Sequence, residues 1–190
     1  MKRVSLLLAL TFGACGAASA ATLDINLSDS ALRGEFGAPL PSLRGQFALG
    51  VLTAKHDHRI SQGHATLLVT GDAGAREANV LAGVGARVLV LAGKDRPGND
   101  VQGGALGLGG MFEARIPAFN RLGGTAYAYW APKVASFGDL NGHLEYALDV
   151  DYQILREASL YAGYRQLRIR SDRDRFNGDN GFHIGVKLQF

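Results

Sequence analysis

The chain has 190 residues, of which 26 are glycine, one is cysteine and one is tryptophan, and its formal net charge is +3. This length suits one domain, and no stretch has the composition of a linker between two domains. Two of the basic residues, Lys2 and Arg3, belong to an N-terminal leader. Without them the charge falls to +1, which removes the argument for a nucleic-acid partner.

Residues 1–20 have the three parts of a secretory signal peptide. Lys2 and Arg3 precede an apolar run, and small residues then end in Ala18-Ser19-Ala20. The run is shorter than the roughly 20 apolar residues that a membrane-spanning helix needs. We therefore expect cleavage after residue 20, with a lipoprotein box ending at Cys15 as the alternative. Loss of Cys15 leaves a mature chain that cannot form disulfides.

Residues 21–42 form a segment with two readings. Leu23, Ile25 and Leu27 alternate with polar residues, and Leu32 and Phe36 follow after a polar turn. The segment is either a periplasmic strap or an extra hairpin of the domain that follows. Both apolar stretches are shorter than the roughly 9–11 residues of a transmembrane strand. We favour the strap, which gives eight strands in total, and keep ten strands as the alternative.

Residues 43–190 show an apolar period of two, which is typical of strands. In the clearest stretch, residues 143–154, one face carries Glu145, Asp149 and Asp151 and the other is wholly apolar. The stretches are about ten to fourteen residues long, whereas soluble strands have about five or six. The pattern predicts an all-β, antiparallel, up-and-down transmembrane β-barrel of the Gram-negative outer membrane. The eight expected strands span residues 43–54, 64–72, 77–91, 103–116, 122–131, 143–154, 158–170 and 181–190.

The C-terminal strand ends in phenylalanine and has an apolar residue at every second position. An amphipathic strand with an unpaired edge can add to the edge of another sheet. We therefore expect the β-barrel assembly machinery to recognise this strand. The apolar positions of this expected assembly signal are Phe182, Ile184, Val186, Leu188 and Phe190.

Several short motifs carry a family resemblance. They are Tyr129-Trp130-Ala131-Pro132 at the end of one strand, Leu144-Glu145-Tyr146 at the start of the next, Ala162-Gly163-Tyr164-Arg165, and the closing residues 185–190. In these motifs the chain resembles the YfaZ family of outer-membrane proteins. The resemblance implies a signal peptide, a barrel and an outer-membrane location. It implies no defined activity, so no catalytic residue is carried over.

The face opposite the apolar stripe carries the charges that we expect to line the lumen. An eight-stranded barrel has an interior just wide enough for side chains to fill. Five acids and five bases there would bridge between strands and exclude a continuous water column. The ten residues of this expected lumen network are Arg44, Glu77, Arg87, Glu113, Arg115, Glu145, Asp149, Asp151, Arg165 and Lys187.

Three other groups of residues have side chains that could serve a specific function. Asp149 and Asp151 could share a proton in acid–base chemistry, but such a site also needs a histidine at the extracellular rim, and both acids lie near the expected periplasmic side, so structural charge is favoured. His56 and His58 flank Asp57 and could bind zinc or copper, but a solvated loop is favoured, so we expect no metal or cofactor. The tyrosines and Trp130 are expected to form membrane-interface girdles.

The sequence thus predicts a place and an architecture more firmly than an activity. We expect a non-enzymatic barrel with a role in the envelope or at the cell surface. It would be a monomer in contact with outer-membrane lipids and lipopolysaccharide. The alternatives are a membrane enzyme that modifies lipid A and a narrow pore.

Overall fold

The computed structural model describes residues 21–55, 59–74, 79–96, 99–116, 119, 121–171 and 175–190. The expected signal peptide, residues 1–20, and the loop with His56 and His58 lie outside these ranges. No helix in the described ranges has the length and apolar character needed to cross a membrane. The strands are β1 (Thr22–Ser28), β2 (Ala31–Leu40), β3 (Gly45–Lys55), β4 (Arg59–Asp72), β5 (Asn79–Arg96), β6 (Asn99–Arg115), β7 (Leu122–Ala131), β8 (Ser136–Gly138), β9 (Leu140–Leu155), β10 (Ala158–Ser171) and β11 (Arg175–Gln189).

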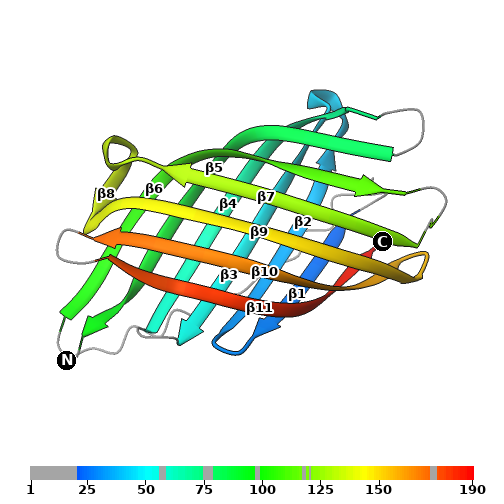
Figure 1. The fold of residues 1–190 in the computed structure, drawn as a ribbon. Coiled ribbons are helices and arrows are strands. Elements are labelled where there is room, and N and C mark those ends of the chain that lie inside the picture. The colour runs from blue at the N-terminus through cyan, green and yellow to red at the C-terminus, as the bar shows by residue number, and fades with distance from the viewer. Residues whose placement is uncertain are drawn as a thin grey trace.

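Ten of these strands form a closed antiparallel barrel (Figure 1). Each pairs with its neighbour along the chain, and β1 pairs with β11 to close the ring. At that seam the Ala21 amide donates to the Phe190 carbonyl at 2.9 Å, and the Phe190 amide donates to the Ala21 carbonyl at 3.0 Å. The eleventh strand, β8, lies outside the ring and pairs with β6 at Gly103–Ala105, beyond the last β6 residue that β7 reaches. Closure leaves the barrel without a free sheet edge.

The expectation of eight strands is wrong, and the ten-strand alternative is confirmed. Residues 22–40 form β1 and β2, which are both part of the barrel wall. β1 has only seven residues because its partner β11 continues beyond the β1–β2 turn, from His183 back to Arg175, whereas β2 has ten residues and begins level with the end of β3. The Ser28 and Ser30 hydroxyls both reach the carboxylate of Asp179 on β11, at 3.1 and 3.4 Å. Strand length is therefore a poor criterion for a membrane crossing, because β11 continues the wall past this turn.

The outside of the barrel carries a broad belt of apolar side chains. Val84, Leu108 and Leu148 are 71%, 66% and 64% exposed, and they alternate with inward-facing residues. Soluble monomers rarely expose so large an apolar surface, whereas barrels in lipid require one. The five apolar residues of the expected assembly signal all belong to this exposed face: Phe182, Ile184, Val186, Leu188 and Phe190.

The pattern reverses near the end of the barrel opposite Ala21 and Phe190. We call this end the far end, and we call the end that holds Ala21 and Phe190 the terminal end. On β10, Leu167 and Ile169 point inward and are almost fully buried, whereas Arg168 and Arg170 are exposed. Apolar inward residues of eight other strands join them. We call this cluster the far-end core, and its largest members are Leu52, Ile60, Leu89, Leu91, Val101, Leu140, Leu167, Ile169 and Phe176.

This reversal corrects the expected loop lengths. The eight expected strands leave residues 55–63, 92–102 and 171–180 as long polar connections, yet most of these residues belong to strands. Polar side chains on the outside of a wall that stands in water look like loop residues when the sequence is read alone. The connection between β7 and β9, residues 132–139, is the exception. It contains η3 (Lys133–Ala135) and β8.

Candidate functional site

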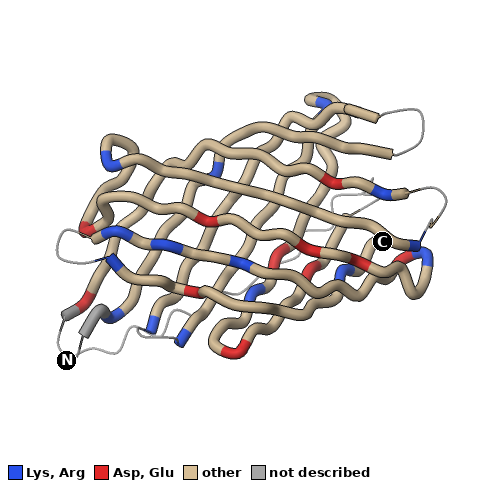
Figure 2. The backbone as a smooth tube through the Cα atoms, in the orientation of Figure 1, with Lys and Arg blue, Asp and Glu red and all other residues tan. Residues whose placement is uncertain are grey.

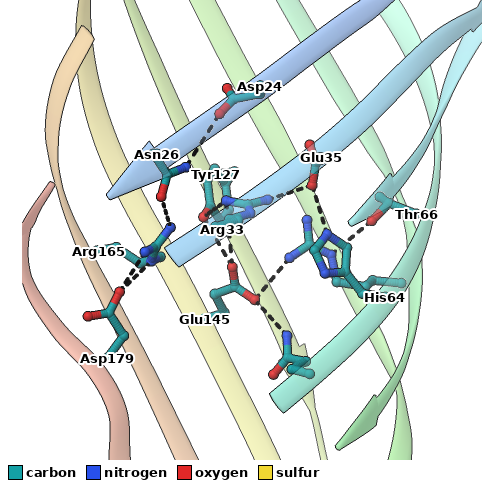
Figure 3. A network of polar contacts seen from close by, with 12 residues as sticks. Asp24, Asn26, Arg33, Glu35, His64, Thr66, Tyr127, Glu145, Arg165 and Asp179 are labelled. Atoms are coloured by element: carbon teal, nitrogen blue, oxygen red, sulfur yellow. Dashed lines mark hydrogen bonds and ion pairs between the residues drawn. The ribbon is translucent and has the colours of Figure 1, made fainter. Parts of the chain in front are cut away.

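A buried polar network crosses the lumen at mid-height, with Glu145 of β9 at its centre (Figure 3). Glu145 has no exposed surface. Its Oε2 accepts a hydrogen bond from Arg87 Nη1 at 3.0 Å and a longer one from Gln62 Nε2 at 3.4 Å. Its Oε1 accepts one from the Tyr127 hydroxyl at 3.1 Å. One carboxylate thus connects β4, β5, β7 and β9 through the lumen.

Arg33 and Glu35 of β2 extend this network to the other side of the lumen. Arg33 donates to the Tyr127 hydroxyl at 2.5 Å and to Glu35 Oε2 at 2.6 Å, and it lies 3.9 Å from Glu145 Oε1. Glu35 Oε2 also lies 2.7 Å from His64 Nε2. Each buried charge therefore faces an opposite one, which offsets the cost of removing it from water. We call the set the central network: Arg33, Glu35, Gln62, His64, Arg87, Tyr127 and Glu145.

A second buried ion pair lies beside the seam between β1 and β11. Arg165 and Asp179 have no exposed surface, and Arg165 Nε and Nη2 lie 2.7 and 2.6 Å from Asp179 Oδ2. The remaining Arg165 nitrogen, Nη1, donates to Asn26 Oδ1 on β1 at 2.8 Å. This seam cluster links the first strand of the barrel to the last two. It closes the ring with charge as well as with backbone hydrogen bonds.

Glycines let polar side chains reach across a whole strand inside the lumen. Glu35 of β2 and His64 of β4 flank Gly50 of β3 in register, and a Cβ at position 50 would lie 2.5 Å from His64 Nε2. Without that Cβ, the histidine ring covers the glycine and meets the carboxylate. The same arrangement, with contact distances of 2.8, 3.0 and 2.8 Å, occurs in Arg115–Gly123–Asp151, Asp149–Gly163–His183 and Tyr161–Gly185–Asn26.

Most of the ten charges expected in the lumen lie there. Arg87, Glu145 and Arg165 are fully buried in the clusters described above, and Arg115 pairs with Asp151. Glu113 and Lys187 line a cavity nearer the terminal end, as does Asp149. The structure does not place the other two residues, Arg44 and Glu77, in the lumen.

Arg44 does not belong to the lumen. It is exposed in the turn between β2 and β3, where it adopts a left-handed conformation with φ of 46°. The expected strand began at residue 43, but β3 begins at Gly45, so the alternation does not extend to Arg44. Glu77 lies outside the described residues.

Sequence reasoning missed the residues that neutralise the predicted charges. Arg33 and Glu35 lie in the expected strap, and Asp179 lies between the last two expected strands. A usable signal existed for the first two, since Arg33 and Glu35 alternate with Leu32 and Phe36. Asp179 follows a register shift in the pairing of β10 with β11, and no period of two reads through such a bulge.

The expected tyrosine girdle is partly wrong. Tyr129 and Tyr161 are buried in the lumen, and Tyr127 is hydrogen-bonded there. The Arg87 guanidinium lies over the Tyr129 ring, 3.7 Å from its centre, which adds a cation–π contact to the central network. Trp130 and Tyr152 do face outward, with 59% and 50% exposure. Whether an aromatic residue lies near the end of a strand does not decide its surroundings. Whether it lies on the inward or the outward face of the strand does.

The lumen has three layers between its two ends. Toward the terminal end is a cavity of about 360 Å³, lined by acids and bases that include Asp24, Glu113 and Lys187. The central network comes next, and the far-end core follows. Among the described residues no three His, Cys, Asp or Glu side chains are grouped as metal ligands. The charged groups in the middle layer serve one another as partners.

Comparison with known proteins places this barrel in a family. No curated protein sequence matches the chain. Three solved structures are similar to it: a KdgM porin (8% identity, TM-score 0.41, 90% of this chain and 99% of that one), a chain from work on in-meso crystallization of membrane proteins (11%, 0.39, 90% and 83%), and a porin refined at 1.8 Å resolution (11%, 0.29, 94% and 64%). A family model described as YfaZ precursor matches residues 1–190. The chain, an outer-membrane β-barrel protein, belongs to the YfaZ family.

Proposed function

We propose that this protein is a non-enzymatic structural component of the outer membrane, with a lumen that conducts no ions. The observation that supports this best is the pair of barriers stacked across the lumen. The central network joins opposite walls through Glu145, and the far-end core fills the space beyond it. We further propose that the terminal end, where the expected assembly signal ends at Phe190, faces the periplasm.

The two barriers oppose an ion in different ways. At the central network, an ion would have to separate Arg87 from Glu145, and breaking a buried pair costs about 3–5 kcal/mol. Beyond it, the ion would meet the apolar side chains of the far-end core, such as Leu52 and Leu167, which offer no replacement for its water. A ten-stranded barrel is wider than an eight-stranded one. The added width is occupied by arginine and tyrosine side chains from four strands.

Planar bilayer recording tests the closed lumen. Folded wild-type protein, identified by a different gel mobility before and after boiling, should give negligible conductance. A general porin inserted under the same conditions is the positive control. Steady, protein-dependent current steps from the wild-type barrel would refute the closed lumen and support the pore.

The main alternative is an enzyme that modifies lipid A. Within the described ranges, the polar side chains in contact with the Nε2 atoms of His64, His143 and His183 are Glu35, Gln62 and Asp149, so these histidines do not activate a hydroxyl or thiol. Mass spectra of lipid A from wild-type and deletion cells should therefore be identical. A species present only in wild-type cells, and restored by the cloned gene, would establish the enzyme instead.

A further inference from the structure

A groove on the outer wall of the barrel has no role in the lumen. It has a volume of about 210 Å³ and lies where β7 ends, across β9 and against β10. Lys133 borders it on one side, Arg168 and Arg170 border it on the other, and Trp130 lies along it. Gly142 lies between the two sides. Because it has no side chain, the space between Lys133 and Arg170 stays open.

The three cations around this groove have no anionic partner in the described part of the chain. Elsewhere at the far end a basic residue does have one, since Lys94 lies 3.5 Å from Asp100. Figure 2 shows the basic residues following one another along β10 toward the far end. Three like charges around one small space repel each other unless an anion lies between them. The guanidinium group of arginine is well suited to phosphate, to which it can donate two parallel hydrogen bonds.

The groove also lies at the edge of the apolar belt that is nearer the far end of the barrel. Trp130 and Arg168 are paired in register with Leu144 from its two sides, so one of the three cations shares a row of the wall with Trp130. Next to it on the outer face are Tyr146 and then Leu148, which is 64% exposed. Tryptophan and tyrosine are typical of the boundary between hydrocarbon and headgroups. A ligand bound here would place its charge in the groove and its chains against the belt.

We infer that this groove binds a phosphate group of the lipid A part of lipopolysaccharide. A zwitterionic phospholipid fits less well, because its own amine would lie among three cations. Lipid A offers phosphates without that amine, together with acyl chains for the belt. The inference rests on the proposed orientation, with the far end toward the outer leaflet. It is independent of whether the lumen conducts.

Trp130 provides the measurement, because it is the only tryptophan in the chain. Lipid A carrying both phosphates is titrated into the folded protein in detergent, and tryptophan emission is followed. The expected result is a saturable change with one lipid A per barrel. Dephosphorylated lipid A, which enters the micelle in the same way, should bind at least about tenfold more weakly. Inorganic phosphate at the same concentration should leave the emission unchanged.

Two matched variants separate the groove from general surface charge. The groove variant replaces Lys133, Arg168 and Arg170 with alanine, and its affinity for lipid A should fall by about a hundredfold. The control variant replaces Lys55, Arg59 and Lys94, which are exposed at the far end of the opposite wall, and its affinity should match wild type. Gel mobility before and after boiling shows that both variants are folded.

Each remaining outcome would overturn the inference. Equal affinity of wild type and the groove variant would show that the groove is not the site. Equal affinity for dephosphorylated lipid A would show that phosphate is not recognised. A saturable response to inorganic phosphate alone would replace the glycolipid with a free anion. None of these results would affect the bilayer recordings, so the closed lumen is tested separately.

Discussion

Replacing Arg165 with alanine removes the cation of the seam cluster and leaves a buried carboxylate. Arg165 makes two contacts with Asp179, at 2.7 and 2.6 Å, and one with Asn26 at 2.8 Å. Two of these contacts, to Asp179 through Nε and to Asn26, are hydrogen bonds that involve a charged group, worth about 1.5–3 kcal/mol each, and the third is an ion-pair contact through Nη2. Asp179 keeps its bond from Ser28 at 3.1 Å. We therefore expect a loss of about 3–5 kcal/mol, the range for a buried charge left unpaired.

A second variant separates the charge effect from lost packing. Changing Arg165 to methionine together with Asp179 to asparagine removes both charges and keeps most of the volume. Its free energy of unfolding should lie within about 2 kcal/mol of wild type, because no ion is left buried alone. Arg156→Ala, in the exposed turn between β9 and β10, should change stability by no more than about 0.5 kcal/mol.

Urea unfolding of the barrel in detergent, followed by gel mobility and circular dichroism, measures these differences. The reasoning is refuted if Arg165→Ala loses less than about 1 kcal/mol. It is also refuted if the double variant is less stable than the single one. Either result would mean that water reaches Asp179 and that the seam is not closed by a buried pair.

Three further predictions concern other parts of the barrel. Gly50→Ala should destabilise by about 1–3 kcal/mol in the same urea assay, because the added Cβ displaces His64 from Glu35, whereas Gly34→Ala, where nothing lies within 4 Å, should be neutral. Leu167→Ala in the far-end core should cost about 2–5 kcal/mol by leaving a cavity; a smaller loss would mean that the core is loosely packed. Deleting Phe190 should leave the protein degraded in the periplasm, and normal outer-membrane levels on immunoblots would place the assembly signal elsewhere.

The sequence predicted the alternation of inward and outward residues well in the part of the wall that faces lipid. On β9, the exposed Leu148, Val150 and Tyr152 alternate with buried or half-buried polar positions as expected. It predicted the strand number poorly, because β1 has only seven residues and looked too short to cross. A crossing strand needs partners on both sides more than it needs a fixed length, and pairing between distant segments is not visible in the local pattern.

The charge network was half predictable for a similar reason. Inward-facing charges such as Arg87 and Arg165 follow from the period of two, but their partners come from strands far away in the chain. The far-end core left one local trace. On β10 the apolar positions shift by one between Tyr164 and Leu167, because the outside of the wall changes from lipid to water. A shift of this kind is easily taken for the end of a strand.

The length of β5 has a consequence for the outer surface of the cell. It runs through 18 residues. At about 3.3 Å per residue and a tilt of about 45°, such a strand rises about 42 Å, whereas the apolar band of an outer-membrane barrel is about 25 Å tall. With the far end outward, much of the excess would stand among the sugars of the outer leaflet. That part is a stiff, hydrogen-bonded stump with a dry interior, so proteases added to intact cells would meet paired strands there instead of long flexible loops.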